Sequence, residues 1–180
     1  MDPEDLPLRP ATAEDWPRIA ALVVEGFATY EAFAPPGWSV PGFDHELEQV
    51  GIMLSRPSAW CAVADDEIGL AGHVGWLAAS EARLVDDEPG LAHFWQLFVR
   101  RDRWGSGLAA KLQTAGLEAA AQHGFTTIRL FTPSGHTRAR RFYEREGWKL
   151  HGEFDDEVFG MPITEYRRRL GPAGGSTAAG

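Results

Sequence analysis

The sequence is poor in cysteine and has no long apolar run. Cys61 is the single cysteine in 180 residues, which excludes an internal disulfide framework, and the six histidines show no spacing typical of a zinc site. No apolar segment reaches the roughly 18 residues that a transmembrane helix needs. The acidic start also lacks the basic-then-apolar order of a signal peptide. We therefore expect a cytoplasmic protein with no metal and no membrane contact, in which Cys61 is a packing residue.

Positive charge is scarce as well. Lys and Arg number 17 against 26 Asp and Glu, and the net charge of −9 argues against general binding to nucleic acid. Basic residues nonetheless gather between Trp95 and Trp148, where nine of them face four acids, a local net charge of +5 (9 − 4). This uneven distribution suits an anionic cofactor on the basic stretch and a cationic substrate elsewhere, with an ordinary solvated face as the alternative.

The length and the 44% hydrophobic content suit one globular domain, which we place at residues 6–170. The Gly- and Ala-rich residues 171–180 are predicted to be a disordered tail. Hydrophobic periodicity and turn residues predict strands at 6–10, 59–64, 68–78, 94–99, 127–131 and 163–170. They predict helices after a capping box at Thr12–Asp15, at 44–54, at 107–123 and through 139–143, with loops at 31–43 and 80–92. The expected fold class is α/β, a mixed and strongly twisted sheet of about six or seven strands flanked by four helices.

The segment LFVRRDRWGSGLAAKL predicts a strand, a turn rich in glycine and the start of a helix. Gly105 and Gly107 let the backbone approach an anion closely, and the unpaired amides of the new helix point at its charge. The same turn also fits a Rossmann pattern, but strand 127–131 ends without the required carboxylate. A Walker loop is excluded because the Gly-Lys-Ser/Thr ending is missing.

A second segment, HTRARRFYEREGW, follows at a characteristic distance. The pair resembles the two signature motifs of the GNAT acetyltransferases, and the order of the elements resembles the GNAT-type acyl-CoA N-acyltransferase fold across residues 6–170. The turn pattern of that family, Gln/Arg-x-x-Gly-x-Gly/Ala, aligns with Trp104–Ala109, from which Trp104 departs. The resemblance implies an acetyl-CoA-dependent N-acetyltransferase, and acetyl-CoA as its cosubstrate.

The resemblance also assigns the cofactor contacts. Leu97, Phe98 and Val99 fall on the strand that parts from its neighbour and pairs with the pantetheine arm, where backbone amides steady the oxyanion. His136 stands where the family often has Asn. The full set of implied cofactor-binding residues is Leu97, Phe98, Val99, Arg103, Trp104, Gly105, Ser106, Gly107, Leu108, Ala109 and His136, and the arginines within 138–141 are further candidates for the phosphates.

Two residues are candidates for catalysis. Tyr143 resembles the general acid of the family, which protonates the departing CoA thiolate, although a core tyrosine beside Phe142 is an alternative. His93 precedes the 97–99 strand where many GNAT enzymes carry Glu, and an ordinary histidine pKa of about 6.5 suits a general base. An ordinary strand histidine, with water as the base, is the other interpretation.

The acceptor is predicted only as a primary amine of a small molecule or a peptide. Loops 31–43 and 80–92 are expected to contact it through Phe33 and Trp38 and through the acids Asp86, Asp87 and Glu88. A non-catalytic acyl-CoA-binding or regulatory module on the same fold is the rival function, and a homodimer is left open.

Overall fold

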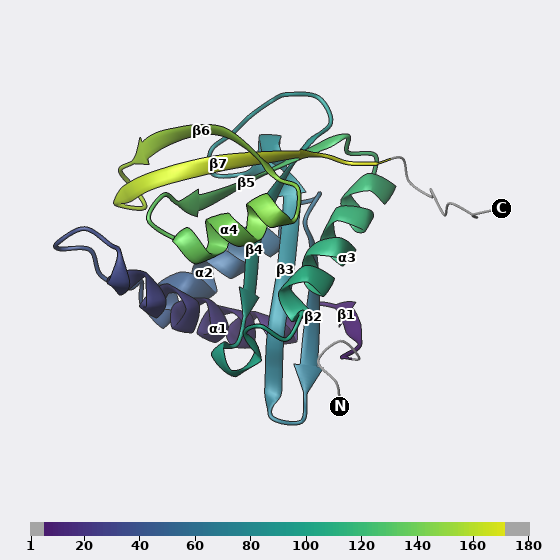
Figure 1. The fold of residues 1–180 in the computed structure, drawn as a ribbon. Coiled ribbons are helices and arrows are strands. Elements are labelled where there is room, and N and C mark those ends of the chain that lie inside the picture. The colour runs from purple at the N-terminus through teal and green to yellow at the C-terminus, as the bar shows by residue number, and fades with distance from the viewer. Residues whose placement is uncertain (1–5, 172–180) are drawn as a thin grey trace.

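The computed structural model describes residues 6–171, which form one seven-stranded sheet flanked by four helices (Figure 1). The strands are β1 (Leu8–Pro10), β2 (Trp60–Asp66), β3 (Gly69–Ala78), β4 (Leu91–Val99), β5 (Thr127–Pro133), β6 (Lys149–Asp156) and β7 (Met161–Arg169). The helices are α1 (Trp16–Ala28), α2 (Phe43–Leu54), α3 (Leu108–Gln122) and α4 (Thr137–Arg145). The strands lie in the order β1-β2-β3-β4-β5-β7-β6. This arrangement confirms the predicted fold class.

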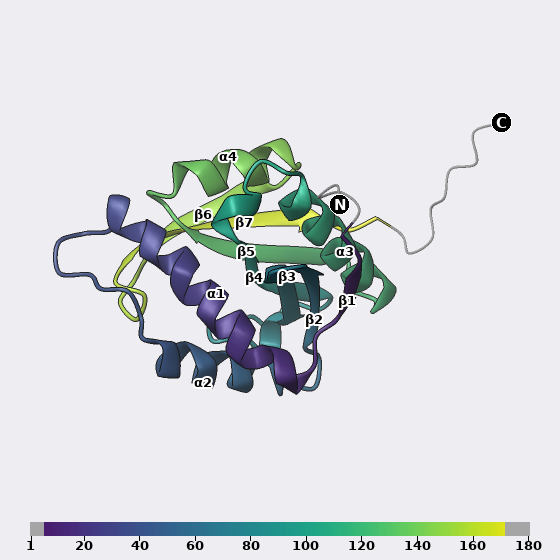
Figure 2. The same cartoon turned by 90° about the horizontal axis from the view of Figure 1, so that it is seen from below.

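Each face of the sheet is covered by two helices. Figure 2 shows α1 and α2 on one face and α3 and α4 on the other. On the first face, Ile19 and Val23 of α1 and Val50 of α2 share a core cluster. On the second face, Leu108 and Leu112 of α3 pack into a separate cluster. The two apolar cores thus hold the sheet between them.

The central pair of strands sets the shape of the molecule. β4 and β5 are parallel, whereas all other neighbouring strands are antiparallel. Their pairing begins at Leu91 with Thr127 and ends at Phe94 with Leu130. An irregularity in the β3–β4 register follows at once, because Gly75 faces Gln96 while Trp76 faces Phe94, which leaves Trp95 as an extra residue. Beyond this bulge, β4 and β5 run in clearly different directions (Figure 1).

The structure corrects the sequence prediction at three places. The strand β6 is absent from the predicted set, because its segment KLHGEFDD is polar and mostly exposed at the edge of the sheet. Strand β4 begins at Leu91, three residues before the predicted start, and β5 continues to Pro133. The predicted tail lies outside the described residues except for Gly171. Within residues 6–171, no helix is long and apolar enough to cross a membrane.

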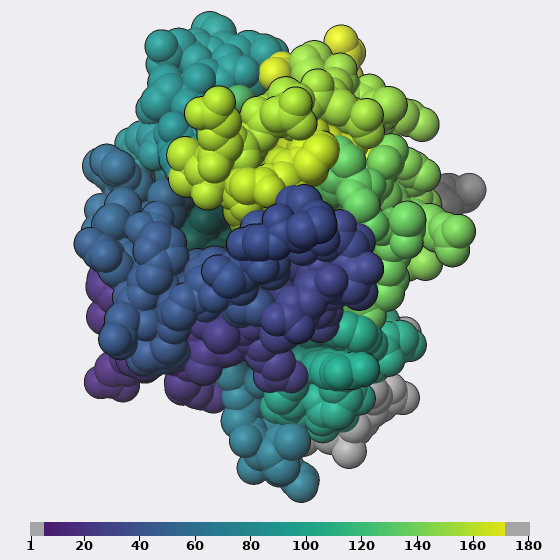
Figure 3. Space-filling view, turned by 90° about the vertical axis from the view of Figure 1, so that its left-hand side faces the viewer, coloured from purple at the N-terminus to yellow at the C-terminus, as the bar shows by residue number. Residues whose placement is uncertain are grey.

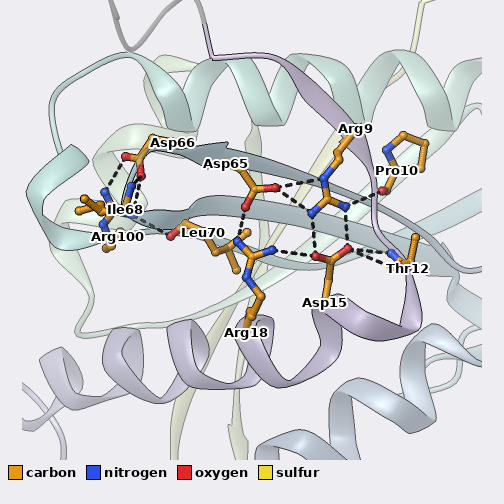
Figure 4. Close-up of polar contacts among 10 residues, drawn as sticks. All are labelled: Arg9, Pro10, Thr12, Asp15, Arg18, Asp65, Asp66, Ile68, Leu70 and Arg100. Carbon is orange, nitrogen blue, oxygen red and sulfur yellow. Dashed lines mark hydrogen bonds and ion pairs between the residues drawn. The ribbon is translucent and has the colours of Figure 1, made fainter.

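Ion pairs join the turn end of the β2–β3 hairpin to the start of α1 (Figure 4). Asp65 accepts hydrogen bonds from Arg9 at 2.7 Å and pairs with Arg18, and both arginines also bind Asp15. Asp15 in addition accepts the Thr12 amide at 2.9 Å, as the capping box predicts. Hydrogen bonds from Arg9 hold the pKa of the Asp15 carboxyl well below its usual range. The start of α1 is therefore joined to the hairpin.

A second ion-pair group joins the hairpin to the segment after β4. Asp66 accepts hydrogen bonds from Arg100 at 2.6 Å and from Arg103 at 2.9 Å, and Arg100 also binds Asp102 at 2.7 Å. The hydrogen bond from Arg100 is the main cause of a pKa of Asp66 well below its usual range. Because residues 101–103 lead directly into the glycine turn, this group fixes where the turn begins.

Candidate active site

The separation of β4 from β5 opens a cavity of about 1440 Å³. Its walls come from β4, from the glycine turn and α3, from α4, from the α1–α2 connection and from the β6–β7 turn. Figure 3 shows a hollow at the surface between the α1–α2 region and the β6–β7 turn, which are far apart in the sequence. The cavity thus reaches from the glycine turn to an opening lined by residues that include Trp38 and Phe159.

Strand β4 supplies one wall with its backbone. Leu97, Phe98 and Val99 pair with Val74, His73 and Gly72 of β3. Their other edge has no strand partner, because the pairing with β5 ends at Phe94. Buried backbone amides and carbonyls require hydrogen-bond partners, so this free edge is a ready template for an extended ligand.

The glycine turn supplies a second wall. Gly105 and Gly107 have φ angles of +80° and +88°, a left-handed conformation that side chains rarely adopt. Gly107 is the N-cap of α3, and no side chain caps its first turn. Among the described residues, the amides of Gly107, Ala109 and Ala110 donate to no backbone carbonyl outside the helix. Ser106 instead closes the turn, since its hydroxyl donates to the Arg103 carbonyl at 2.7 Å. The turn therefore presents unpaired amides to the cavity, as an anion site requires. Leu108, by contrast, is fully buried in the core.

The arginines around the turn differ in their partners. Arg103 lines the cavity, but its guanidinium is bound to Asp66. Arg138 of α4 lies over the ring of Trp104, 3.3 Å from its centroid, and the Trp104 indole N–H donates to the Val99 carbonyl at 2.8 Å. Trp104, which replaces a polar residue of the family pattern, thus anchors a cation above the turn. Among the described residues, Arg138 and Arg141 form no ion pair, and both line the cavity.

Tyr143 of α4 lines the cavity, and its ring lies 5.3 Å from that of Phe142 and 5.8 Å from that of Trp148. Burial raises the pKa of the Tyr143 phenol well above its ordinary value, so that the phenol stays protonated at neutral pH. No hydrogen bond to its hydroxyl is found among the described residues. The protonated Tyr143 hydroxyl therefore lies on the cavity wall with no hydrogen-bond partner among the described residues.

His136 is the N-cap residue of α4 and lies between Tyr30 and Phe33, each with a ring centroid 5.1 Å away. Its Nδ1 accepts the Ala139 amide at 3.4 Å. Burial and the charge of Arg138 lower the pKa of His136 to about 4. The ring is therefore neutral, and its Nε2–H remains a donor toward the cavity that it lines.

His93 also lines the cavity, but within the paired part of β4. Burial, together with the charges of Arg129 and Arg83, lowers the pKa of His93 to about 3. Its Nδ1 is buried without a hydrogen-bond partner among the described residues. The role of His93 as a general base stays a prediction, and such a low pKa makes its imidazole a weak proton acceptor.

The loops expected to meet the acceptor behave differently from each other. The 31–43 loop lines the cavity from Pro35 to Pro41, with Trp38 among its residues. In the 80–92 loop, Asp86 instead pairs with Arg129 at 3.4 Å and with Arg167 at 3.2 Å. Asp86, Asp87 and Glu88 are not among the lining residues; Arg83 and Leu84 are. Cys61 lies away from the cavity, and burial raises the pKa of its thiol to about 12.

Sequence reasoning missed several lining residues, among them Tyr30 and Glu46. Tyr30 ends the helical pattern of α1 and is buried, with its ring 5.2 Å from that of Phe27. Glu46 precedes Val50 and Met53 by one and two turns of α2, so it occupies the apolar face of that helix. A carboxylate at an apolar position was the available signal in the sequence.

Comparison with known proteins agrees with this geometry. The pattern of the "Acetyltransferase (GNAT) family" matches residues 23–148. The uncharacterized N-acetyltransferase YjgM of Escherichia coli K12 is 28% identical over 149 residues, 82% of this chain and 84% of its own length. Among solved structures, yncA of Salmonella typhimurium with its cofactor acetyl-CoA has a TM-score of 0.68 at 15% identity, covering 97% of this chain and 99% of its own. A spermidine N-acetyltransferase SpeG mutant from Vibrio cholerae has a TM-score of 0.67 at 18% identity, covering 93% and 95%.

The fold and the family match thus define the class of the protein as an acetyltransferase. The chain belongs to the GNAT acetyltransferase family. It is an acetyl-CoA-dependent N-acetyltransferase, as the resemblance of its motifs predicts.

The glycine turn can be tested by substitution. We expect Gly107→Val to weaken acetyl-CoA binding at least about tenfold, because the new side chain intrudes on the turn and one lost charge-assisted hydrogen bond is worth about 1.5–3 kcal/mol. Calorimetric titration with acetyl-CoA measures the loss. Gly124→Val is the matched control, since Gly124 has the same φ of +88° and open space around it. Both variants lose stability, but unchanged affinity in a folded Gly107→Val protein would show that the turn does not bind the cofactor.

Proposed function

We propose that this enzyme moves the acetyl group of acetyl-CoA to a primary amine of a small molecule or a peptide by direct attack, with Tyr143 as the general acid. The observation that carries the proposal is the position of the free Tyr143 hydroxyl on the wall of the cavity that also holds the unpaired edge of β4. Its fold neighbours include a spermidine N-acetyltransferase and a ribosomal-protein-alanine N-acetyltransferase, so the fold accepts both acceptor types.

The cofactor is proposed to bind along the parted strands. The pyrophosphate contacts the amides from Gly105 to Ala109, and its charge is complemented by Arg138 and Arg141, which form no ion pair among the described residues. The pantetheine arm lies along Leu97 to Val99, where it completes the hydrogen bonding that β5 does not provide. Arg103, already bound to Asp66, positions the turn and shares its charge with the phosphates.

In the chemical step, the amine nitrogen attacks the thioester carbonyl carbon, and backbone amides of the Leu97–Val99 edge stabilise the resulting oxyanion. The tetrahedral intermediate collapses with cleavage of the carbon–sulfur bond. As the sulfur leaves, Tyr143 gives it a proton and becomes a phenolate. The nitrogen loses one proton to water, and Tyr143 takes a proton back from water, so the products are the N-acetylated amine and CoA.

The nitrogen needs a proton acceptor. With its pKa near 3, His93 is neutral at physiological pH yet binds a proton far more weakly than an amine does. We therefore propose that the proton leaves to water, and that the neutral His93 ring orients this water or the acceptor by a hydrogen bond.

The phenol of Tyr143 can be deleted without its ring. We expect Tyr143→Phe to keep acetyl-CoA affinity and to lower the maximal rate by about 10²-fold or more, the range for losing a positioned general acid. Thiol release under single-turnover conditions gives the rate. Tyr166→Phe is the control: Tyr166 lies 6.3 Å from Tyr143, but its hydroxyl donates to Glu144 at 2.6 Å. Full turnover by the Tyr143→Phe enzyme would refute the role.

The pH dependence tests the proton acceptor. Because the pKa of His93 is lowered, the ring does not titrate near pH 6.5, and we expect kcat/KM to rise smoothly with the deprotonation of the amine. His93→Gln keeps a hydrogen-bonding group and should lower kcat/KM by less than about tenfold. A pH profile with an inflection near 6.5 that disappears in His93→Gln would establish His93 as the base and contradict the proposal.

A further inference from the structure

Aromatic rings wall part of the cavity. Phe27 lies in the last turn of α1 and Tyr30 just after it, Trp38 lies in the α1–α2 connection, and Phe159 lies in the β6–β7 turn. The Tyr30 ring is 6.3 Å from both Trp38 and Phe159, and Phe27 is 5.8 Å from Phe159. The Trp38 indole N–H donates to the Phe159 carbonyl at 3.0 Å. We call residues 27, 30, 38 and 159, all of which line the cavity, the aromatic group.

One buried carboxylate without a hydrogen bond among the described residues also lines the cavity. The Glu46 side chain is 6% exposed and lines the cavity from α2. It accepts no hydrogen bond from any described residue, and the nearest basic side chain is the exposed His45, whose Nε2 lies 4.0 Å from the carboxylate. Burial raises the pKa of Glu46. Burying a charge is expensive unless a partner compensates it, so this carboxylate favours the binding of a cation.

The other acids near the opening are already occupied. Asp156 is the second acid that lines the cavity, but it pairs with Arg83 and accepts the backbone amides of Val158 and Phe159 at 3.0 and 3.1 Å. Asp86 and Glu88 of the 80–92 loop pair with Arg129 and Arg167, which do not line the cavity. Among the described residues, Glu46 is therefore the one lining carboxylate that is free to bind a ligand.

Aromatic rings and a carboxylate together are a site for an organic cation, because ring faces attract positive charge and the carboxylate neutralises it. We propose that the acceptor carries a second positive charge besides its reacting amine, and that Glu46 binds this second charge within the aromatic group. The acceptor class is a di- or polycationic amine. This inference deepens the proposed function and rests on it.

The placement of the helices favours binding of the second charge of the acceptor to Glu46, rather than binding of its reacting nitrogen. Tyr143 belongs to α4, which covers one face of the sheet, whereas Glu46 belongs to α2 on the opposite face (Figure 2). An acceptor that presents one amine to the thioester beside Tyr143 extends its other end toward α2. A carboxylate beside the reacting nitrogen would also favour its ammonium form, which cannot attack.

Binding of two amines of equal length tests the inference without catalysis. We use 1,5-diaminopentane and pentylamine in calorimetric titrations of the protein saturated with CoA. The wild-type protein should bind the diamine at least about tenfold more tightly, as a desolvated ion pair with Glu46 predicts. Glu46→Gln keeps the shape of the side chain and should remove this preference while leaving pentylamine and acetyl-CoA affinities unchanged. Its melting temperature should hold or rise, because a buried unpaired charge is removed.

Glu48→Gln is the matched control, since it removes the same charge from an exposed position of α2 outside the cavity. It should keep the preference for the diamine. Equal affinities of the two amines in the wild type, or a preference that survives Glu46→Gln, would overturn the inference. An equal loss of both amines would assign Glu46 to the reacting nitrogen and also overturn it. If none of the diamine, pentylamine and spermidine supports thiol release, that result would instead count against the proposed function. The binding comparison would still decide the role of Glu46.

Discussion

The end of hydrogen bonding between β4 and β5 is the constraint on which the rest of the site depends. Four residue pairs join the strands, and beyond Phe94 and Leu130 each strand is held only by its outer neighbour, β3 or β7. The bulge at Trp95 turns β4 away at the same point. The sheet therefore keeps its rigidity while one strand edge remains unpaired inside the molecule.

The basic stretch predicted from the sequence lies around that unpaired edge. Some of its arginines are bound to acids of the protein, and others face the cavity. Arg100 and Arg103 bind Asp66 and secure the glycine turn, whereas Arg138 lies over Trp104 at the cavity wall. On the other face of the sheet, α2 carries the buried carboxylate of Glu46. With the cofactor and the acceptor that we propose, an anion and a cation meet at the parted strands from opposite sides.

Much of this arrangement could be predicted from local sequence. The glycine turn and the helices were predictable because left-handed glycines and apolar periodicity are local signals. Strand β6 was not, since its pairing with β7 does not depend on an apolar pattern at an exposed edge. The position of the loop acid Asp86 was not predictable either. Asp86 pairs with Arg129 and Arg167 of strands distant in the sequence, and such long-range pairs leave no periodic pattern in the sequence. The low pKa of His93 likewise follows from burial beside Arg129, not from its position in the motif.

Amide hydrogen exchange with and without acetyl-CoA tests the central claim most directly, because it reports on the unpaired strand edge itself. The account predicts that acetyl-CoA slows exchange at the amides of Leu97 to Val99 and of Gly105 to Ala110, with little change along the paired residues Leu91 to Phe94. Protection by acetyl-CoA elsewhere in the chain, with both of these segments unchanged, would contradict it.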